Sequence, residues 1–261
     1  MGRLQNKSII ITGAGSGIGA GFAKAMANEG ATIGVADINL DSANKVVSEI
    51  LSTGGKAIAL KVDVTNRSEV AAAFGSFAKE TGALDVVFNN AGFNKPMPFL
   101  EVTEDNFNAV MNVNGLGVLI GIQEAAKLMI SLGKGGKIIN TSSIAGRQGY
   151  PDFAPYCASK FAVNALTQAA ARGLAEYGIT CNSFSPGVVD TPLWVTLDKD
   201  LMEMGATSTP GQSITDFSSD IILGRPAQPE DLAGTAIFLA SGDSDYFTGQ
   251  TIMIDGGKVL V

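Results

Sequence analysis

The sequence contains no histidine and only two cysteines among its 261 residues. A Ser-His-Asp triad and a His-ligated catalytic zinc are therefore excluded. Cys157 and Cys181 do not form a CxxC pair, so neither a zinc knuckle nor a redox dithiol is indicated, and we expect no metal site. Any proton transfer near neutral pH must instead use a Tyr, Lys, Cys or carboxylate group whose pKa is shifted.

Basic residues are also scarce, with 18 against 25 acidic residues and a formal net charge of −7, and they form no cluster. Binding to nucleic acid or to an anionic lipid surface through charge is therefore disfavoured. The sequence has no uninterrupted run of about 18 apolar residues and no signal-peptide pattern at its start. We expect a cytoplasmic protein with neither a membrane nor a nucleic-acid partner.

Short apolar runs rich in β-branched residues alternate with longer amphipathic stretches along the chain. Strands are predicted at residues 8–12, 31–36, 56–62, 84–88, 137–141, 179–184 and 251–254. Helices are predicted at residues 18–29, 40–51, 68–80, 104–131, 155–177 and 229–240. This alternation predicts an α/β fold, a single Rossmann-type doubly wound parallel sheet of about seven strands with helices on both faces. Right-handed crossovers place the loops after the strands at one edge, where ligands bind in such sheets.

No linker, internal repeat or low-complexity tract divides the chain, so residues 1–261 are expected to form one dinucleotide-binding and catalytic domain. Residues 192–222 depart from the regular patterning, because they are rich in Thr, Ser, Asp, Met and Gly. We interpret this segment as a small mobile flap over a substrate site. A plain surface insertion is the alternative.

A glycine-rich segment joins the first predicted strand to the first predicted helix, with the spacing T-G-x-x-x-G-x-G. Glycines permit a sharp turn there and leave room for a pyrophosphate at the helix N-terminus. No Lys-Ser/Thr pair follows the last glycine, so the segment is not a P-loop. The position between strand and helix predicts dinucleotide binding. The candidate contacts in this segment are Gly13, Ser16, Gly17, Ile18 and Gly19.

Asp37 ends the second predicted strand, where the adenosine ribose of a dinucleotide would lie. A carboxylate there accepts hydrogen bonds from both ribose hydroxyls of NAD and repels the 2′-phosphate of NADP. No arginine or lysine occupies Ser16, Ile38 or Asn39 to compensate. The expected cofactor is therefore NAD. The alternative is that Asp37 only caps the following turn.

Two further polar segments follow predicted strands. Asp63 and Val64, after the third strand, could meet an adenine through a carboxylate and a backbone N–H, although Asp also commonly opens a turn. Asn90, within the run Asn89-Asn90-Ala91-Gly92, suits a close approach to a ribose and bracing of adjacent strands, with an Asx turn as the alternative.

Tyr156 and Lys160 lie four residues apart in a predicted helix and therefore on one face of it. A tyrosine with a pKa near 10 is a poor base at pH 7, but a nearby ammonium and an oxidised nicotinamide would favour tyrosinate and lower that pKa. Ser143, thirteen residues upstream of Tyr156, could hold a substrate oxygen while Tyr156 takes its proton. A lone Tyr-x-x-x-Lys is usually an ordinary helix surface, so its meaning depends on the other motifs.

The chain resembles the short-chain dehydrogenase/reductase family over essentially its whole length. The matching segments are Thr12 to Gly19, Asp63-Val64, Asn89 to Gly92, Asn114, Ser143, Tyr156 with Lys160, and Pro186-Gly187 with Thr191.

Several roles are implied by this resemblance alone. Asn114 would interrupt its helix and hold a water that links Lys160 to solvent, completing a catalytic set with Ser143 and Tyr156. Val189 and Thr191 would grip the nicotinamide carboxamide. The resemblance also implies a homotetramer, with the predicted helices 104–131 and 155–177 in the interfaces.

Within the family, the C-terminal segment 244–257 and the run 160–168 are similar to polyol and diol dehydrogenases of the acetoin reductase/2,3-butanediol and sorbitol types. Butanediol enzymes usually carry polar amides at the positions of Ile144 and Tyr150, so this chain departs from them there. The candidate substrate residues are Ser143, Ile144, Tyr150, Asn94 and Trp194, with Phe93 and Val188 as further pocket walls. They suggest a secondary alcohol with one apolar side and one or two polar handles.

The sequence thus predicts an NAD-dependent oxidoreductase that interconverts a secondary alcohol, such as a polyol or diol, and its ketone. Tyr156 is expected to act as the general base and acid. One alternative is a 3-oxoacyl or steroid ketone reductase of the same family. Another is a catalytically silent dinucleotide-binding protein.

Overall fold

The computed structural model describes residues 2–260. One sheet of seven strands, all paired in parallel, has the order β3-β2-β1-β4-β5-β6-β7. The strands are β1 (Ser8–Thr12), β2 (Thr32–Asp37), β3 (Lys56–Lys61), β4 (Val86–Asn89), β5 (Gly136–Thr141), β6 (Ile179–Pro186) and β7 (Thr251–Ile254). The predicted doubly wound parallel sheet is confirmed, and the order reverses beside β1, where a ligand crevice forms in such sheets.

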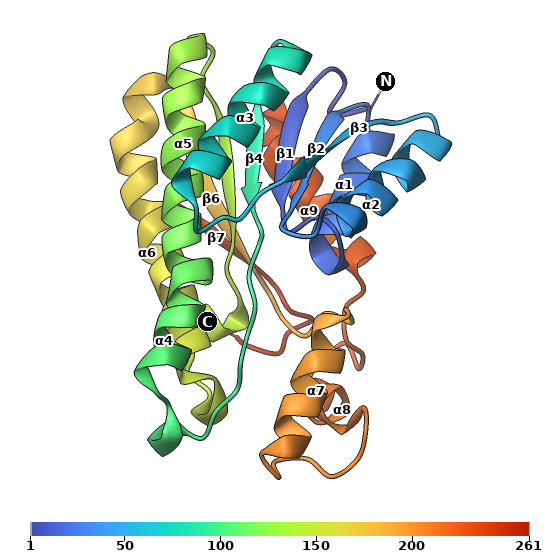
Figure 1. Cartoon of the computed structure of the whole chain (residues 1–261), viewed down its shortest axis with the longest axis vertical. Coiled ribbons are helices and arrows are strands. Elements are labelled where there is room, and N and C mark those ends of the chain that lie inside the picture. Colours follow the sequence, from blue (N-terminus) through green and yellow to red (C-terminus); the bar gives the residue numbers. More distant parts are fainter. Residues whose placement is uncertain (1, 261) are drawn as a thin grey trace.

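Helices cover both faces of the sheet (Figure 1). One layer holds α1 (Gly17–Asn28), α2 (Leu40–Ser52) and α9 (Pro229–Ala240), and the other holds α3 (Arg67–Thr81), α5 (Gly117–Leu132) and α6 (Ala154–Leu174). Each layer encloses its own apolar core. In β1, Ile9 and Ile11 enter the first core and Ile10 the second, because successive side chains point to opposite faces.

Local signals in the sequence fix several helix boundaries. The Asn39 side chain accepts a hydrogen bond from Ser42 N at 3.1 Å and so caps α2, and Asn66 caps α3 in the same way. Gly82 ends α3 with φ 77°, a left-handed conformation that favours glycine. Single 3₁₀ turns make up η1 (Phe99–Glu101), η3 (Ile144–Gly146), η4 (Pro151–Phe153), η5 (Ala175–Tyr177) and η6 (Gly242–Ser244).

The predicted helix 104–131 consists of three parts, α4 (Glu104–Met111), the π-helical segment η2 (Asn112–Leu116) and α5. Together, Glu104–Leu132 is long and apolar enough to cross a membrane by length and composition, with a mean hydropathy of 1.4 in its most apolar window. Half of that window is buried inside the protein, which is also the pattern of a core helix. Its α5 part packs against the sheet and α3.

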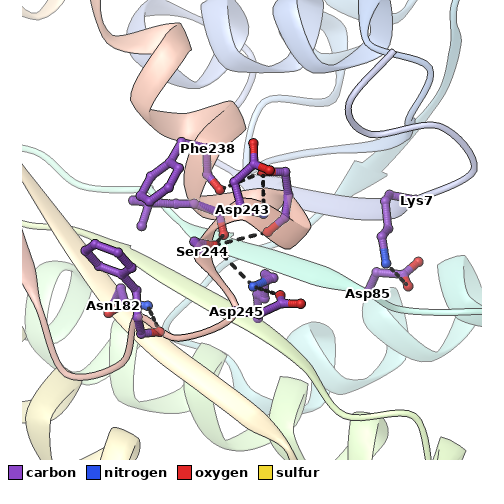
Figure 2. A network of polar contacts seen from close by, with 11 residues as sticks. Lys7, Asp85, Asn182, Phe238, Asp243, Ser244 and Asp245 are labelled. Carbon is purple, nitrogen blue, oxygen red and sulfur yellow. Dashed lines mark hydrogen bonds and ion pairs between the residues drawn. The ribbon is translucent and has the colours of Figure 1, made fainter. Parts of the chain in front are cut away.

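Polar contacts join the connections at the edge where the strands begin (Figure 2). Lys7 pairs with Asp85 at 3.3 Å, which ties the start of β1 to the start of β4. Asn182 Nδ2 donates to Phe247 O at 2.8 Å and so holds the loop before β7 against β6. This edge lies opposite the carboxyl ends of the strands.

The segment predicted as an irregular flap contains two helices, α7 (Leu193–Glu203) and α8 (Gln212–Ser218), so the expectation of irregular structure there is wrong. They project as a hairpin beyond the carboxyl edge of the sheet (Figure 1). The two ends of the segment meet at its base. Ala227 N donates to Val188 O at 2.9 Å, and Asp190 N donates to Ala227 O at 2.8 Å.

Candidate active site

A cleft of about 600 Å³ opens at the carboxyl edge of the sheet. Eleven of the residues predicted to bind a cofactor or to react line it, and they come from seven different strands, connections and helices. These residues are Gly13, Ser16, Gly17, Ile18, Asp37, Asp63, Val64, Asn90, Tyr156, Lys160 and Thr191. The fold therefore brings together residues that are up to 178 positions apart in the sequence (Gly13 and Thr191).

The glycine segment forms one wall of this cleft. Gly13 and Gly17 have φ values of 63° and 54°, where a side chain would be strained. Ser16 precedes α1 in an extended conformation and its side chain does not cap the helix, so the N–H groups of the first turn have no side-chain partner there. A helix N-terminus of this kind suits the pyrophosphate of a dinucleotide.

Gly19 does not line the cleft. A Cβ at this position would lie 2.7 Å from Asn90 Nδ2, so glycine here allows α1 to pack closely on the neighbouring loop. Gly19 thus has a packing role, and its direct contact with a cofactor stays a prediction.

Asp37 lines the cleft, and both of its carboxylate oxygens already accept backbone hydrogen bonds. Gly15 N donates at 2.9 Å and Asn39 N donates at 2.9 Å. The turn-capping alternative is therefore realised. It does not compete with ribose binding, because each carboxylate oxygen offers two acceptor positions. Lys160 is the only basic side chain that lines the cleft within the described residues.

Asp63 and Asn90 line the cleft but use their side chains mainly to fix loops. Asp63 Oδ1 accepts from Thr65 N at 2.9 Å and Thr65 Oγ1 at 2.7 Å, which is the expected turn. Asn90 Nδ2 donates to Thr12 O at 3.0 Å, and Asn90 Oδ1 accepts from Thr141 Oγ1 at 3.2 Å. Asn90 therefore braces β1 and β5 on either side of β4.

Tyr156 and Lys160 face the cleft from the first two turns of α6. Lys160 Nζ lies 5.5 Å from the centre of the Tyr156 ring and donates to Thr141 O at 2.8 Å. Lys160 is only 4% exposed. The helical spacing thus places the ammonium beside the phenol, as the sequence predicts.

Burial shifts the pKa values of Tyr156 and Lys160 in opposite directions. Burial raises the pKa of Tyr156 to about 12, and hydrogen bonding with the Ser143 hydroxyl opposes only part of that increase. Burial lowers the pKa of Lys160 to about 8. In the chain alone, desolvation dominates both shifts, because burial disfavours the charged form of each group. The lowering of the Tyr156 pKa by Lys160 together with an oxidised nicotinamide stays a prediction.

Ser143 lies at the start of η3, where its Oγ accepts from Ala145 N at 3.1 Å. It does not line the 600 Å³ cleft, but its hydroxyl is close enough to hydrogen bond with the Tyr156 phenol. Tyr156 therefore lies both at the dinucleotide cleft and beside a predicted substrate residue.

Asn114 is fully buried in the π-helical segment, so the predicted interruption of this helix is confirmed. Its amide clamps the Phe93 backbone, with Oδ1 accepting from Phe93 N at 3.0 Å and Nδ2 donating to Phe93 O at 2.8 Å. A Cβ at Gly92 would lie 3.0 Å from Asn114 Oδ1 and 3.7 Å from Lys160 Nζ. Glycine at position 92 therefore keeps open the space between the Asn114 amide and the Lys160 ammonium.

The two residues predicted to grip the carboxamide differ in position. Thr191 lines the cleft beside Gly17, where a Cβ would lie 3.4 Å from the Thr191 side chain. Val189 is buried and pairs with Ala227 in a short parallel bridge, away from the cleft lining. Its backbone therefore joins the two ends of the flap while its side chain packs in the apolar core, and its contact with the carboxamide stays a prediction.

The other predicted substrate residues, Ile144, Tyr150, Asn94 and Trp194, also lie outside the dinucleotide cleft. The Tyr150 and Trp194 rings both pack against Phe217, with centroid distances of 6.2 and 5.6 Å. Ile144 and Asn94 are buried, and Asn94 Oδ1 has no hydrogen-bond partner within residues 2–260. Tyr150 and Trp194 pack on the same small apolar core as Tyr156.

Sequence reasoning missed several residues that the flap contributes. Leu193 and Thr196 of α7 line the dinucleotide cleft, and Phe217 of α8 contacts the aromatic residues beside it. A signal for α7 was present, because Leu193, Leu197 and Leu201 recur every four residues.

The profile of the family described as "Enoyl-(Acyl carrier protein) reductase" matches residues 13–258. The "Diacetyl reductase [(S)-acetoin forming]" of Staphylococcus epidermidis is 41% identical over 255 residues, covering 98% of this chain and 99% of that protein. The "L-2,3-butanediol dehydrogenase" of Corynebacterium glutamicum is 41% identical, with coverages of 98% and 99%. The "Galactitol 2-dehydrogenase" of Agrobacterium fabrum is 39% identical, with coverages of 98% and 98%.

Solved structures agree with these relatives. A "short-chain type dehydrogenase/reductase from Mycobacterium marinum" superposes with a TM-score of 0.89 at 36% identity, covering 99% of this chain and 97% of that one. The predicted likeness to diol and polyol dehydrogenases is confirmed by the names of the relatives. With this fold, cleft and set of relatives, the chain belongs to the short-chain dehydrogenase/reductase family.

Proposed function

We propose that the protein is an NAD-dependent oxidoreductase that interconverts a small secondary alcohol, a diol or polyol, and its ketone. The observation that carries this proposal is that Tyr156 and Lys160 line the same cleft as the glycine segment and Asp37. A pure dinucleotide binder needs no such pair. The relatives named for acetoin, butanediol and galactitol support the substrate class.

The chemistry divides between cofactor and protein. A nicotinamide bound in the cleft supplies hydride acceptance and donation. Tyr156 exchanges the proton of the substrate hydroxyl, and Ser143 holds the substrate oxygen beside it. Lys160 orients the phenol and favours its ionised form once further positive charge is present in the cleft. Asn114 positions the Phe93 backbone and, through a water, connects Lys160 to solvent.

Asp37 supports NAD over NADP. Its carboxylate is fixed by two backbone N–H groups and faces the cleft where the second strand ends. A 2′-phosphate there would meet a negative charge, and among residues 2–260 no basic side chain lines that end of the cleft to offset it.

The substrate pocket is proposed to lie between Tyr156, η3 and the flap. Ile144, Tyr150 and Trp194 provide its apolar side. Asn94 provides a polar handle, which is supported by its buried and unpartnered Oδ1. A secondary alcohol with one small apolar substituent and one polar group fits this set.

The single-domain organisation, the mobility of the flap, the homotetramer and the cytoplasmic location are further parts of this proposal. Exposed apolar side chains on α4 to α6, among them Phe107, Leu116 and Phe161, support contacts between copies along these helices. Both cysteines are unpaired and buried, which suits a reducing compartment.

The test is a panel of diols and polyols assayed with NAD and, separately, NADP, following the absorbance of the reduced nicotinamide. We expect NAD-dependent turnover of at least one vicinal diol. Preference for NADP together with turnover of 3-oxoacyl or steroid ketones would favour the alternative reductase. Thermal stabilisation by a dinucleotide without any turnover would favour a silent binder.

A further inference from the structure

Phe217 connects the flap to the body of the protein. Its ring lies 5.4 Å from Phe153 and 6.2 Å from Tyr150, which belong to the body, and 5.6 Å from Trp194 of α7. Rings at these separations interact favourably beyond their buried area. The flap is therefore docked on the body through an aromatic cluster, here defined as Tyr150, Phe153, Trp194 and Phe217.

The aromatic cluster is continuous with the reactive centre. Leu197 and Leu201 of α7, 4% and 2% exposed, share a small apolar core with Phe153 of η4 and Cys157 of α6. Tyr156, Tyr150, Trp194 and Phe217 all pack against this same core. A displacement of Phe217 therefore changes the packing around the proposed general base.

The position of Phe217 is set by α7 and not by its own short helix. α8 has only seven residues, which is too short to be stable alone. Asp198 of α7 holds its start, because it accepts from Gly211 N at 2.6 Å, Ser213 N at 3.1 Å and Ser213 Oγ at 2.6 Å. The two flap helices thus form one unit that presents the Phe217 ring at a defined place.

Two of the proposed substrate residues, Tyr150 and Trp194, contact the Phe217 ring instead of the dinucleotide cleft. We propose that Phe217 is a specificity-determining residue. Its ring forms the flap-side wall of the substrate pocket and limits the size of the apolar substituent on the reacting carbon. This inference rests on the proposed function and names the residue that sets substrate size at the same site.

The kinetic test compares Phe217→Ala and Phe217→Leu with the unchanged protein. The substrates are 2,3-butanediol and a vicinal diol that carries a phenyl group in place of one methyl group. We expect Phe217→Ala to raise the kcat/KM ratio of the phenyl diol to butanediol by at least about tenfold, because pocket contacts of this size discriminate by that order. Phe217→Leu should give a smaller increase.

The matched control is Val195→Ala, since Val195 lies on the same flap helix but is 75% exposed. It should leave the ratio unchanged. If the ratio in both Phe217 variants stays within about twofold of its value in the unchanged protein, the proposal is overturned. Phe217 would then have a packing role only. If Phe217→Ala does not fold, the ratio in Phe217→Leu decides.

Trp194 offers a readout besides activity, because it is the only tryptophan in the sequence and contacts Phe217. Collisional quenching of its emission by acrylamide should increase in Phe217→Ala and stay unchanged in Val195→Ala. Increased quenching with an unchanged kcat/KM ratio would contradict a role in specificity. It would show that Phe217 holds the packing around Trp194 without affecting the choice of substrate.

Failure of the proposed function can be told apart from failure of this inference. If the unchanged protein oxidises no diol with either dinucleotide, the proposed function fails. In that case, Trp194 emission is used to measure the dissociation constants of the phenyl and methyl hydroxyketones in the presence of dinucleotide. The ratio of these two constants then replaces the kcat/KM ratio. A shift of at least about tenfold in Phe217→Ala supports the proposal, and no shift, or no binding of either ketone, overturns it.

Discussion

At the residue scale, desolvation shifts the pKa values of Tyr156 and Lys160 in opposite directions in the chain alone. The pKa of Tyr156 is raised to about 12 and that of Lys160 is lowered to about 8, both mainly by burial. The sequence predicted the pairing correctly from the four-residue spacing. It could not predict the direction of the pKa shifts, because burial depends on the tertiary packing around α6 and not on the spacing within that helix.

The lowered pKa of Lys160 predicts a pH-dependent stability term. Below pH 8 the ammonium is charged in both states and the burial penalty is fully present. From about pH 8 to 10.5 the unfolded chain binds more protons, so the free energy of unfolding rises with pH. Lys160→Met removes this term. Relative to that variant, the unchanged protein should gain up to about 3 kcal/mol between pH 7 and 10.

Urea unfolding of both proteins at several pH values measures this difference. Lys199→Met is the control, since the Lys199 side chain is 74% exposed. If the unfolding free energies of the unchanged protein and Lys160→Met run parallel from pH 7 to 10, Lys160 does not carry the shifted pKa.

Asp37 gives a second residue-scale prediction. Asp37→Ser should weaken NAD binding by about 10- to 100-fold, which is the usual effect of losing hydrogen bonds to a charged group. It should also reduce the ratio of NAD affinity to NADP affinity. Titration calorimetry with both dinucleotides measures this change. Asp41→Ser, on the exposed start of α2, is the control. Unchanged NAD affinity in Asp37→Ser would leave the carboxylate with its turn-capping role alone.

At the scale of elements, the core strands and helices could be predicted because their apolar patterns are long and their ends carry local signals. β1, β7 and α9 begin and end where the sequence predicts. The helix α8 could not be placed as easily. Its start depends on Asp198, whose partners lie 13 and 15 residues away, and such a contact leaves no periodic pattern.

Asp198 therefore yields a prediction for the flap. Asp198→Ala should remove the hydrogen bonds that hold Gly211 and Ser213, so α8 should lose its fixed position while the sheet keeps its stability. We expect faster hydrogen exchange and faster proteolytic cleavage confined to residues 205–219. Lys199→Ala, one residue along on the exposed side of α7, should change neither. Cleavage at an unchanged rate in Asp198→Ala would contradict this description of the flap.

At the scale of the whole molecule, the sequence predicted the parallel sheet and most of the dinucleotide cleft. It did so because motifs at the ends of strands converge at one edge once the topology is right. The substrate side was less predictable. Ile144, Tyr150 and Trp194 were chosen from the resemblance, whereas Phe217, which contacts two of them, lies in a segment without a motif.

The proposed tetramer is tested through α6. Phe161 is 48% exposed on that helix, and a charge there would face a partner copy across an apolar interface. Phe161→Glu should shift the molar mass measured by light scattering to that of a dimer or monomer. Leu51→Glu, 53% exposed on α2, should not. A monomer in the unchanged protein would contradict the proposal directly.

We propose that one phenol, which lines the dinucleotide cleft and packs on the apolar core shared with the flap, exchanges the proton of a substrate alcohol. The rate of reduced nicotinamide formation by Tyr156→Phe tests this role, with dinucleotide affinity measured in parallel. We expect a rate lowered by about 10²- to 10⁴-fold with dinucleotide affinity nearly unchanged. A variant that keeps most of the activity would contradict it.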